Sequence, residues 1–478
     1  MPSWIIDKFG AGVSDYENKG PMGSFKTGSS LDIRKLIDSL SCQQALVDVT
    51  PSGWNELCLA HVPASDGSSY FFLKNGKIFK LTSGGTFSLV YTETQESGLI
   101  TGAEEWYDNL GNTYLLYATP TRLNIKKIIG TGGYVNTEPW ADLNTAAIGT
   151  WPKTNLTSSL HTMKQVNGTL QICNGNVMAM VGYDLSYTNL SLQLIPGHTA
   201  KALLERGLDV IIGAARVDSA DKSMIFAWDQ IALNYNSKKI IPVKSINALI
   251  DTDRPLAQVG TNGALYYADF LNVLPITYFT GGGQVNPSGV ENDQGLALFG
   301  VFGNGTGNTG IWSYGKKRNN SPYALNLEYP ITCDEIGTVK KVSTDIFVTY
   351  KSGSSYFVKK VDTTAKAVAT YGGLDLEVPA KYIKRDQELP TFTEIKILTA
   401  PLPAGTSIQV KRKINKTGSF NVCDLEGGAT TFDTDDATEA VFKVGDLGRI
   451  IEPQFILTPS GNLTPEIYSA EIFFDLPK

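Results

Sequence analysis

A turn-and-strand pattern recurs along this chain at a nearly constant interval, and it limits the possible folds more than any other feature. Seven times, a turn containing Gly, Asn, Asp or Ser is followed by a short apolar or aromatic strand. The seven strands are marked by Tyr70, Tyr114, Met178, Ile225, Leu265, Ile311 and Tyr356, at intervals of 44, 64, 47, 40, 46 and 45 residues. Such a length holds one four-stranded antiparallel sheet with short loops. The pattern therefore predicts a β-propeller, in which radial stacking buries both faces of every sheet.

The number of repeats predicts the number of blades. We expect seven, and six stay open because the 64-residue interval and the irregular stretch Gly130–Trp151 could hide or imitate a blade. The composition agrees with an all-β chain, because 47 glycines supply turn positions and the aromatic residues suit pleated strands. Charged residues make up only 18% of the chain, against an average of about 25%. This composition excludes a disordered chain and a coiled coil.

Three segments follow from these patterns. Residues 1–50 are expected to form an extended N-terminal arm rich in Gly and Ser, and residues 51–385 the propeller. Residues 391–478 contain five alternating apolar strands separated by turns, which predicts an antiparallel β-sandwich. The charged stretch Ala380–Pro390 is expected to link the last two segments.

Helix is expected at few places. In the arm, Ile33, Leu36, Ile37 and Leu40 have the i, i+3, i+4, i+7 spacing of a short amphipathic helix, and an extended arm is the alternative. His198–Asp209 and Asn247–Asp251 are two further helix candidates, which would lie in loops between strands.

The sequence contains no recognisable catalytic or metal-binding motif. The three histidines, His61, His161 and His198, are too dispersed to indicate a metal cluster, and His61 is expected within a strand. The cysteines lack the spacing of a disulfide framework or a zinc site, so we expect them to be small buried apolar residues; they are Cys42, Cys58, Cys173, Cys333 and Cys423.

Two groups of acidic residues and a set of tryptophans are candidate sites. Closely spaced loop carboxylates are typical calcium ligands, but a solvated loop is the favoured interpretation of Asp433, Asp435, Asp436 and Glu439. A pair of acids facing a cleft would serve glycoside hydrolysis, but a polar blade surface is the favoured interpretation of Glu93, Glu96, Glu104, Glu105 and Asp108. Exposed tryptophans would offer a platform on which sugar rings stack, but core packing is the favoured interpretation of Trp54, Trp106, Trp140, Trp151, Trp228 and Trp312.

The charge pattern gives no indication of a nucleic-acid partner. The chain has 41 Lys and Arg against 47 Asp and Glu, for a net charge of -6, and its basic residues are scattered. No stretch approaches the roughly 18 consecutive apolar residues of a membrane span, and the first residues do not resemble a signal peptide.

Two parts of the sequence resemble structural proteins of tailed bacteriophages. They are Phe9–Asp48, and the C-terminal segments Pro401–Phe420 and Glu439–Phe474. The expected propeller is similar in plan to the tail accessory, packaged-DNA-stabilisation and tail-hub proteins of short-tailed phages. The resemblance implies a virion component at the neck or tail, present in several copies around the tail axis. It carries no catalytic residues, so we expect no enzymatic activity, cofactor or metal.

Our main hypothesis is therefore a non-enzymatic structural protein of a phage virion, assembled in the host cytoplasm, that contributes to tail assembly and particle integrity. Its expected partners are other tail or neck proteins and further copies of itself in a ring. The candidate assembly residues lie in the arm and are Tyr16, Phe25, Ile33 and Leu36. Two alternatives stay open: a tail-tip adhesin that binds host glycan through exposed Trp and Tyr, and a propeller that degrades polysaccharide.

Overall fold

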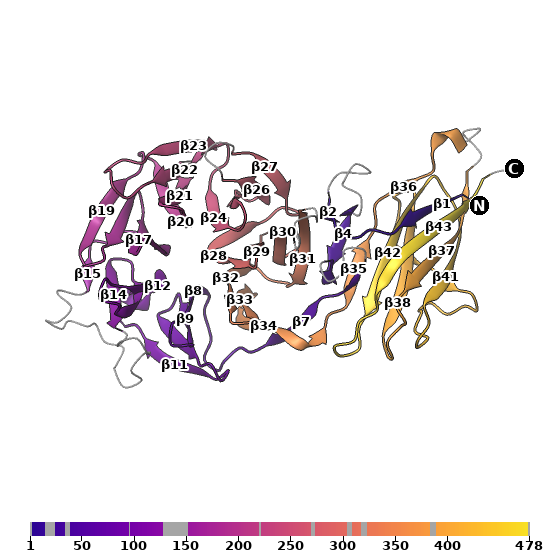
Figure 1. The fold of residues 1–478 in the computed structure, drawn as a ribbon, viewed down its shortest axis with the longest axis horizontal. Coiled ribbons are helices and arrows are strands. Elements are labelled where there is room, and N and C mark those ends of the chain that lie inside the picture. The colour runs from indigo at the N-terminus through magenta and orange to yellow at the C-terminus, as the bar shows by residue number, and fades with distance from the viewer. Residues whose placement is uncertain are drawn as a thin grey trace. The chain divides into compact units, whose positions relative to one another are not determined.

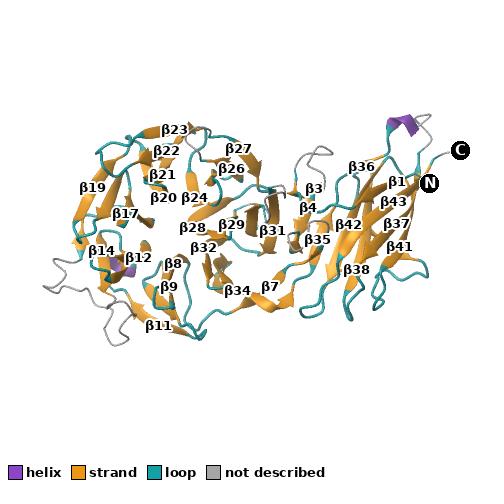
Figure 2. Cartoon of the chain, in the orientation of Figure 1, coloured by secondary structure: helices purple, strands orange, loops and turns teal. Residues whose placement is uncertain are grey.

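The computed structural model shows an all-β protein and describes residues 2–14, 24–33, 39–94, 96–127, 152–218, 221–268, 273–303, 308–316, 323–382 and 389–476. Within these ranges there is no α-helix, and the turns η1 (Glu96–Gly98) and η3 (Ala380–Tyr382) are short 3-10 helices. Strands dominate the chain (Figure 2). Contacts divide it into unit 1, residues 1–47, 311–330 and 361–478, and unit 2, residues 48–310 and 331–360.

Unit 2 is built from small antiparallel sheets. Five sheets lie wholly within its described residues, and each joins four consecutive strands in sequence order. Their strands are β8 (Cys58–Pro63), β9 (Ser69–Leu73), β10 (Lys77–Leu81), β11 (Phe87–Thr92), β12 (Gly102–Tyr107), β13 (Thr113–Ala118), β14 (Arg122–Lys127), β15 (Lys153–Thr154), β16 (Met163–Val166), β17 (Thr169–Asn174), β18 (Val177–Val181), β19 (Tyr187–Gln193), β20 (His198–Arg206), β21 (Asp209–Arg216), β22 (Ser223–Trp228), β23 (Ser237–Ile241), β24 (Ile246–Asp251), β25 (Pro255–Val259), β26 (Ala264–Tyr267) and β27 (Pro275–Tyr278). The antiparallel pattern continues in β28 (Gln284–Asp293), β29 (Leu296–Phe302), β32 (Glu335–Val342), β33 (Asp345–Ser352) and β34 (Ser355–Lys366).

Strand β9 shows why these sheets stack face to face. All five of its residues are buried, although a strand with one solvated face would alternate between buried and exposed positions. Tyr70 and Phe72 pack in one apolar cluster with Leu115 and Tyr117 of the next sheet. Phe71 packs on the opposite face, in a cluster with Phe347 of β33. Each sheet is therefore enclosed by a neighbour on either side.

The stacking is cyclic. The first strands of successive sheets contact one another in the order β8, β12, β16, β20, β24, β28, β32, and β32 contacts β8 again. The start of unit 2 also joins its last sheet, since the Val49 amide donates to the Val358 carbonyl at 3.0 Å and the Val358 amide to Thr50 Oγ1 at 2.9 Å. Figure 1 shows the sheets of unit 2 arranged as a ring. This is the arrangement of a β-propeller.

Unit 1 contains two larger sheets. One has the order β1-β43-β37-β41-β40, and the other β39-β38-β42-β35-β4, with β36 also paired to β42. Their strands are β1 (Ser3–Ile6), β4 (Thr27–Ser29), β35 (Ala369–Gly372), β36 (Leu376–Glu377), β37 (Thr391–Thr399), β38 (Ser407–Ile414), β39 (Asn421–Val422), β40 (Asp424–Leu425), β41 (Glu439–Leu447), β42 (Ile450–Thr458) and β43 (Ile467–Asp475). The remaining strands are β2 (Gly12–Val13), β3 (Ser24–Phe25), β5 (Leu31–Asp32), β6 (Ser41–Cys42), β7 (Gln44–Asp48), β30 (Gly310–Gly315) and β31 (Ala324–Pro330).

The N-terminal segment supplies part of the core of unit 1. The Tyr371 ring is fully buried and stacks on Phe455 of β42 with ring centroids 5.4 Å apart. From the N-terminal segment, Phe25 and Phe9 reach the same ring at 5.4 Å and 5.5 Å. Because these aromatic side chains exclude water together, Phe9 and Phe25 of the N-terminal segment form one folded unit with β35 and β42.

The predicted strands are present, but two predicted helices are not. His198–Asp209 was expected to be a helix and forms β20 and the following turn, and Asn247–Asp251 lies in β24. Their Ala, Leu, Lys and Glu residues favour helix locally, but first strands of the ring are packed between two neighbours, and this tertiary packing overrides local propensity. The arm helix expected around Leu36 falls on residues 34–38, outside the described residues.

The long interval in the repeat has a structural explanation. Tyr70 and Tyr114 mark second strands of their sheets, whereas Met178, Ile225 and Leu265 mark third strands. The 64-residue interval therefore includes a change from second to third strand. The corresponding second strands β13 and β17 begin at Thr113 and Thr169, 56 residues apart (169 − 113). The rest of the excess falls in residues 128–151, which are outside the described residues, as is most of the predicted linker.

Candidate functional site

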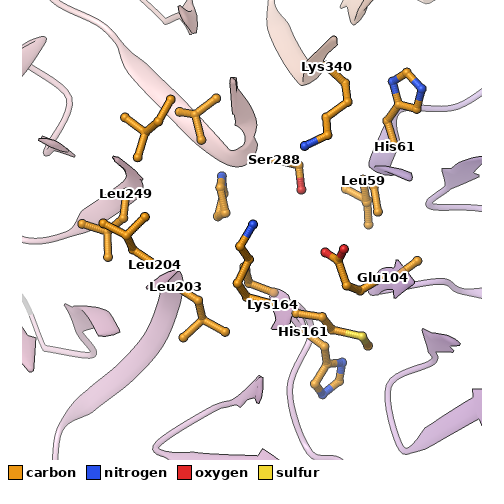
Figure 3. A pocket seen from close by; sticks show the side chains of 18 of the residues that line it. Leu59, His61, Glu104, His161, Lys164, Leu203, Leu204, Leu249, Ser288 and Lys340 are labelled. Carbon is orange, nitrogen blue, oxygen red and sulfur yellow. The ribbon is translucent and has the colours of Figure 1, made fainter. Parts of the chain in front are cut away.

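A cavity of about 320 Å³ lies where the first strands of unit 2 meet. It is lined by residues of β8, β12, β16, β20, β24, β28 and β32, so each contacting first strand contributes to it. Figure 3 shows Glu104, Lys164, Ser288 and Lys340 directed into this space. These polar side chains line the space between the first strands, which we call the central cavity.

Several charged side chains of the central cavity have a neighbour as an ion-pair or hydrogen-bond partner. Lys340 Nζ lies 3.0 Å from Glu291 Oε2, and Asp251 Oδ1 lies 3.8 Å from the guanidinium of Arg206. Glu205 accepts a hydrogen bond from the Asn167 amide at 3.2 Å. These contacts fix the acids of β20, β24 and β28 at the cavity wall.

Glu104 and Lys164 are different, because no salt bridge joins either of them to another residue in the described ranges. Burial raises the pKa of the Glu104 carboxyl, although the nearby ammonium groups of Lys164 and Lys340 act in the opposite direction. Burial likewise raises the pKa of Asp251. Glu104 and Lys164 are thus an acceptor and a donor that remain available to a ligand.

A second, open recess of about 540 Å³ adjoins the central cavity. It shares Glu104, Lys164 and Glu205 with the cavity, and its other lining residues are Tyr107, Gln165, Asn167, Gly168 and Tyr183. Glu104 and Tyr107 lie in β12, Lys164 and Gln165 in β16, and Glu205 near the end of β20. Asn167 and Gly168 form the turn after β16, and Tyr183 lies in the turn between β18 and β19. We call this site the tyrosine recess.

The Tyr183 ring is held in a fixed position within the recess. It lies against Gly168, where a Cβ atom would overlap the ring, and Gly168 has a φ of +77° that disfavours other residues. The Tyr183 hydroxyl donates to the Asn167 carbonyl, and the Tyr183 carbonyl accepts from the Asn109 amide at 3.1 Å. Tyr183 is still 47% exposed as a residue, and Tyr107 is 51% exposed. Both rings therefore present surface to solvent.

The five acids considered as a catalytic group are not brought together as one cluster. Glu93 accepts from the Tyr117 hydroxyl at 2.8 Å, Glu96 pairs with Arg122 at 3.1 Å, and Glu105 accepts from Ser65 Oγ at 2.9 Å. Asp108 accepts from the Tyr114 hydroxyl at 2.8 Å and from backbone amides of its own turn. Among these five, Glu104 lines the central cavity.

The three histidines lie in separate structural environments. His61 is in β8 as expected, is buried against Phe71 with ring centroids 3.8 Å apart, and has its pKa lowered well below the usual value by burial and by Lys340. Burial lowers the pKa of His161 to about 4, and its Nδ1 lies 2.6 Å from Thr101 Oγ1. His198 Nε2 contacts the Lys222 carbonyl at 3.1 Å. No group of three potential metal ligands was found in the described ranges.

The four candidate platform tryptophans that the structure describes do not form an exposed surface. Trp54, Trp106, Trp228 and Trp312 are all buried, as the core interpretation predicts, and Trp140 and Trp151 lie outside the described residues. The acidic loop before β41 is largely exposed, and its Glu439 pairs with Lys396 at 2.8 Å. Four of the cysteines are buried and unpaired, as expected, and Cys333 is half-buried.

The candidate assembly residues of the arm divide into two pairs. Phe25 and Ile33 are buried in unit 1, so their side chains serve its packing, and Tyr16 and Leu36 lie outside the described residues. The part played by the arm in assembly stays a prediction.

Sequence reasoning did not select Tyr107, Tyr183, Lys164 or Glu205. Tyr107 and Glu205 lie near the ends of β12 and β20, Lys164 lies within β16, and Tyr183 lies in the turn before β19. Such positions recur throughout this chain, so the sequence does not identify which of these segments meet in space.

Comparisons with known proteins give a likeness in fold alone. No protein-family model matches the sequence. No curated protein matches it either. Among solved structures, the chain is similar to the extracellular domain of BT4673 from B. thetaiotaomicron (12% identity, TM-score 0.45, 74% of this chain and 43% of that chain), to streptogramin B lyase (11%, 0.43, 67% and 98%) and to Chaetomium thermophilum Raptor (9%, 0.47, 68% and 30%). The chain thus spans less than half the length of the first and the third. Such low identities carry no functional argument. Among the described residues, no helix is long and apolar enough to cross a membrane.

Proposed function

We propose that unit 2 is a closed seven-bladed β-propeller and that the two sheets of unit 1 form a β-sandwich. The cyclic contacts of β8, β12, β16, β20, β24, β28 and β32 support seven blades. The apolar cluster that joins Phe71 to Phe347 supports closure between the first and the last of them. A closed ring leaves few exposed sheet edges and resists deformation, which suits a rigid spacer.

We propose further that the chain is a non-enzymatic structural component of a tailed-phage virion, placed at the neck or tail. The observation that carries this proposal is the position of β1 in the N-terminal arm, just before the segment Phe9–Asp48 that resembles phage proteins. β1 pairs with β43 at one edge of its sheet, and its Ile5 side chain is 64% exposed. An edge strand offers unpaired backbone groups and, here, an apolar side chain to a second copy or another virion protein. The arm would thus join subunits while remaining anchored in unit 1.

Two measurements test this proposal. Sedimentation gives the mass of the purified full-length protein in solution, and immunogold labelling locates the protein in phage particles from the source culture. We expect a defined oligomer in solution and label at the neck or tail. Ile5→Lys should lower the mass of the oligomer, because it places a charge at the exposed edge. Leu463→Lys, at a residue 50% exposed in the turn after β42, is the matched control and should leave the mass unchanged. A monomer that is absent from every particle would overturn the proposal.

The alternative of a tail-tip adhesin is favoured by one observation, the pair of exposed tyrosines beside a polar recess. Label at the distal tip of the tail, rather than at the neck, would support this alternative.

A further inference from the structure

We propose that the tyrosine recess is a binding site for an uncharged saccharide, with Tyr183 as the ring on which a pyranose stacks. This inference concerns residues of unit 2 only and does not depend on the virion role proposed above. It rests on three features of the recess: a fixed and exposed aromatic ring, a lining of hydrogen-bonding side chains, and a balance of charge that disfavours anions.

The first feature is the preorganised ring of Tyr183. Its ring lies on Gly168, its hydroxyl donates to the Asn167 carbonyl, and its backbone is tied to Asn109. A ring fixed in this way loses little conformational entropy when a ligand binds. Because Tyr183 is 47% exposed and lines the recess, its ring is available for the apolar C–H groups of a sugar. Tyr107, at the end of β12, adds a second exposed ring to the wall of the same recess.

The second feature is the supply of donors and acceptors around the rings. Glu104 and Glu205 provide carboxylate acceptors, Lys164 provides an ammonium donor, and Gln165 provides an amide that can do both. Vicinal hydroxyl groups of a sugar both donate and accept, so they match this mixture. Glu104 and Lys164 have no salt-bridge partner among the described residues, and a bound hydroxyl group would satisfy them at little cost.

The third feature is charge, which selects among the possible ligands. Two carboxylates face one ammonium group in the recess, whereas Asp251 and Glu291 of the adjoining central cavity are paired with Arg206 and Lys340. Phosphorylated, sulfated or acidic ligands would meet an excess of negative charge. A purely apolar ligand would bury Glu104 and Lys164 without hydrogen bonds. An uncharged polyhydroxyl ligand avoids both costs.

Isothermal titration calorimetry of the full-length protein tests the proposal with four uncharged oligosaccharides: maltohexaose, cellohexaose, laminarihexaose and N-acetylchitohexaose. Hyaluronan hexasaccharide serves as the anionic comparison. We expect at least one uncharged oligosaccharide to bind in the micromolar to millimolar range, and the anionic one to bind at least tenfold more weakly.

Substitutions then locate the site. Tyr183→Ala should weaken binding at least tenfold, and Glu205→Gln should weaken it severalfold. The matched controls are Tyr278→Ala, at a residue 43% exposed in β27 and outside the recess, and Glu426→Gln, whose side chain is 85% exposed in unit 1. Both controls should bind as the unchanged protein does. Circular dichroism and thermal unfolding would verify that Tyr183→Ala remains folded, and Tyr183→Phe, which keeps the ring, should retain most of the affinity.

Three results would overturn the proposal. The first is the absence of binding by all four uncharged oligosaccharides at 10 mM. The second is binding that is unaffected by Tyr183→Ala, and the third is tighter binding of hyaluronan than of the uncharged oligosaccharides.

Discussion

Lys26 Nζ lies 3.0 Å from Glu452 Oε2, so an ion pair joins two residues that are 426 positions apart in the chain. Lys26 also lies 3.3 Å from Asp375, and both acids are almost completely buried. Lys413 approaches Glu452 at 3.3 Å, and Lys416 approaches Asp375 at 2.9 Å. This network connects the N-terminal arm to the strands of unit 1, and its integrity can be tested directly.

Lys26→Met should destabilise unit 1 by about 2 kcal/mol, because each buried carboxylate then loses one of its two ammonium partners. Hydrogen exchange of amides in β42 and β43 measures this change, with amides of β13 as an internal reference in unit 2. Lys396→Met is the matched control, since Lys396 pairs with a Glu439 side chain that is 58% exposed. The control should cost less than about 1 kcal/mol. Equal effects of the two substitutions would contradict the buried network.

Unit 1 should lose stability in acid through Asp375. Hydrogen bonds and charges from Lys416 and Lys26 outweigh the effect of burial and hold the pKa of Asp375 below its usual value of 3.8. The unfolded chain therefore binds this proton more readily, so the stabilisation is complete above about pH 4 to 5 and is lost as the pH falls through the folded pKa. Calorimetric unfolding between pH 5 and pH 2.5 should show a smaller pH dependence for Asp375→Asn. An unchanged dependence would show that other carboxylates are responsible.

His161 should make unit 2 sensitive to pH in a higher range. Its pKa is lowered from 6.5 to about 4 by burial, so the unfolded chain again binds the proton more readily. Stability is complete above pH 6.5 and falls as the pH decreases towards 4, by at most about 3 kcal/mol. His161→Asn should reduce that slope in urea unfolding measured at pH 7, 6, 5 and 4.5. The same urea unfolding series of His198→Asn serves as a comparison, because it replaces a second buried histidine, in β20. If the slope stays the same in His161→Asn, protonation of His161 does not limit stability.

Gly102→Ala should destabilise unit 2 by about 3 kcal/mol. A Cβ atom at this position of β12 would lie 1.9 Å from the His161 carbonyl oxygen, which is backbone and cannot move freely. Thermal unfolding measures the stability of Gly102→Ala against that of the control Gly84→Ala. A Cβ atom at Gly84 would meet only the Thr82 hydroxyl, at 3.8 Å. A Gly102→Ala protein as stable as the Gly84→Ala protein would contradict the close approach of β12 to the segment that precedes β16.

Deletion of residues 1–40 should leave the propeller folded and prevent assembly. The deletion removes β1 and β4, which are edge strands of the two sheets of unit 1, and the buried Phe9 and Phe25. Amides of β9, β13 and β21 should keep their protection from hydrogen exchange, whereas those of β35 and β43 should lose it. Sedimentation should show no defined oligomer. Loss of protection in all of these strands would mean that unit 2 depends on the arm.

The sequence predicted the elements whose cause is local. Gly-containing turns and alternating apolar strands are determined by a few adjacent residues, so the repeated sheets and the five longest C-terminal strands could be identified. The same local evidence failed at His198–Asp209, where good helix formers lie in a strand because of the neighbours that enclose it. It also could not distinguish second strands from third strands, since both follow similar turns.

Only the tertiary structure decided which side chains meet. Glu104, Lys164 and Glu205 come from three different sheets, and Tyr183 reaches them from a turn, so their proximity depends on how the sheets stack. The burial of Phe25 likewise depends on Tyr371, 346 residues later (371 − 25). Turns and strands depend on a few adjacent residues, so the sequence alone determines them. Closure of the ring and the composition of a site depend on contacts between segments far apart in the chain, so only the tertiary structure decides them.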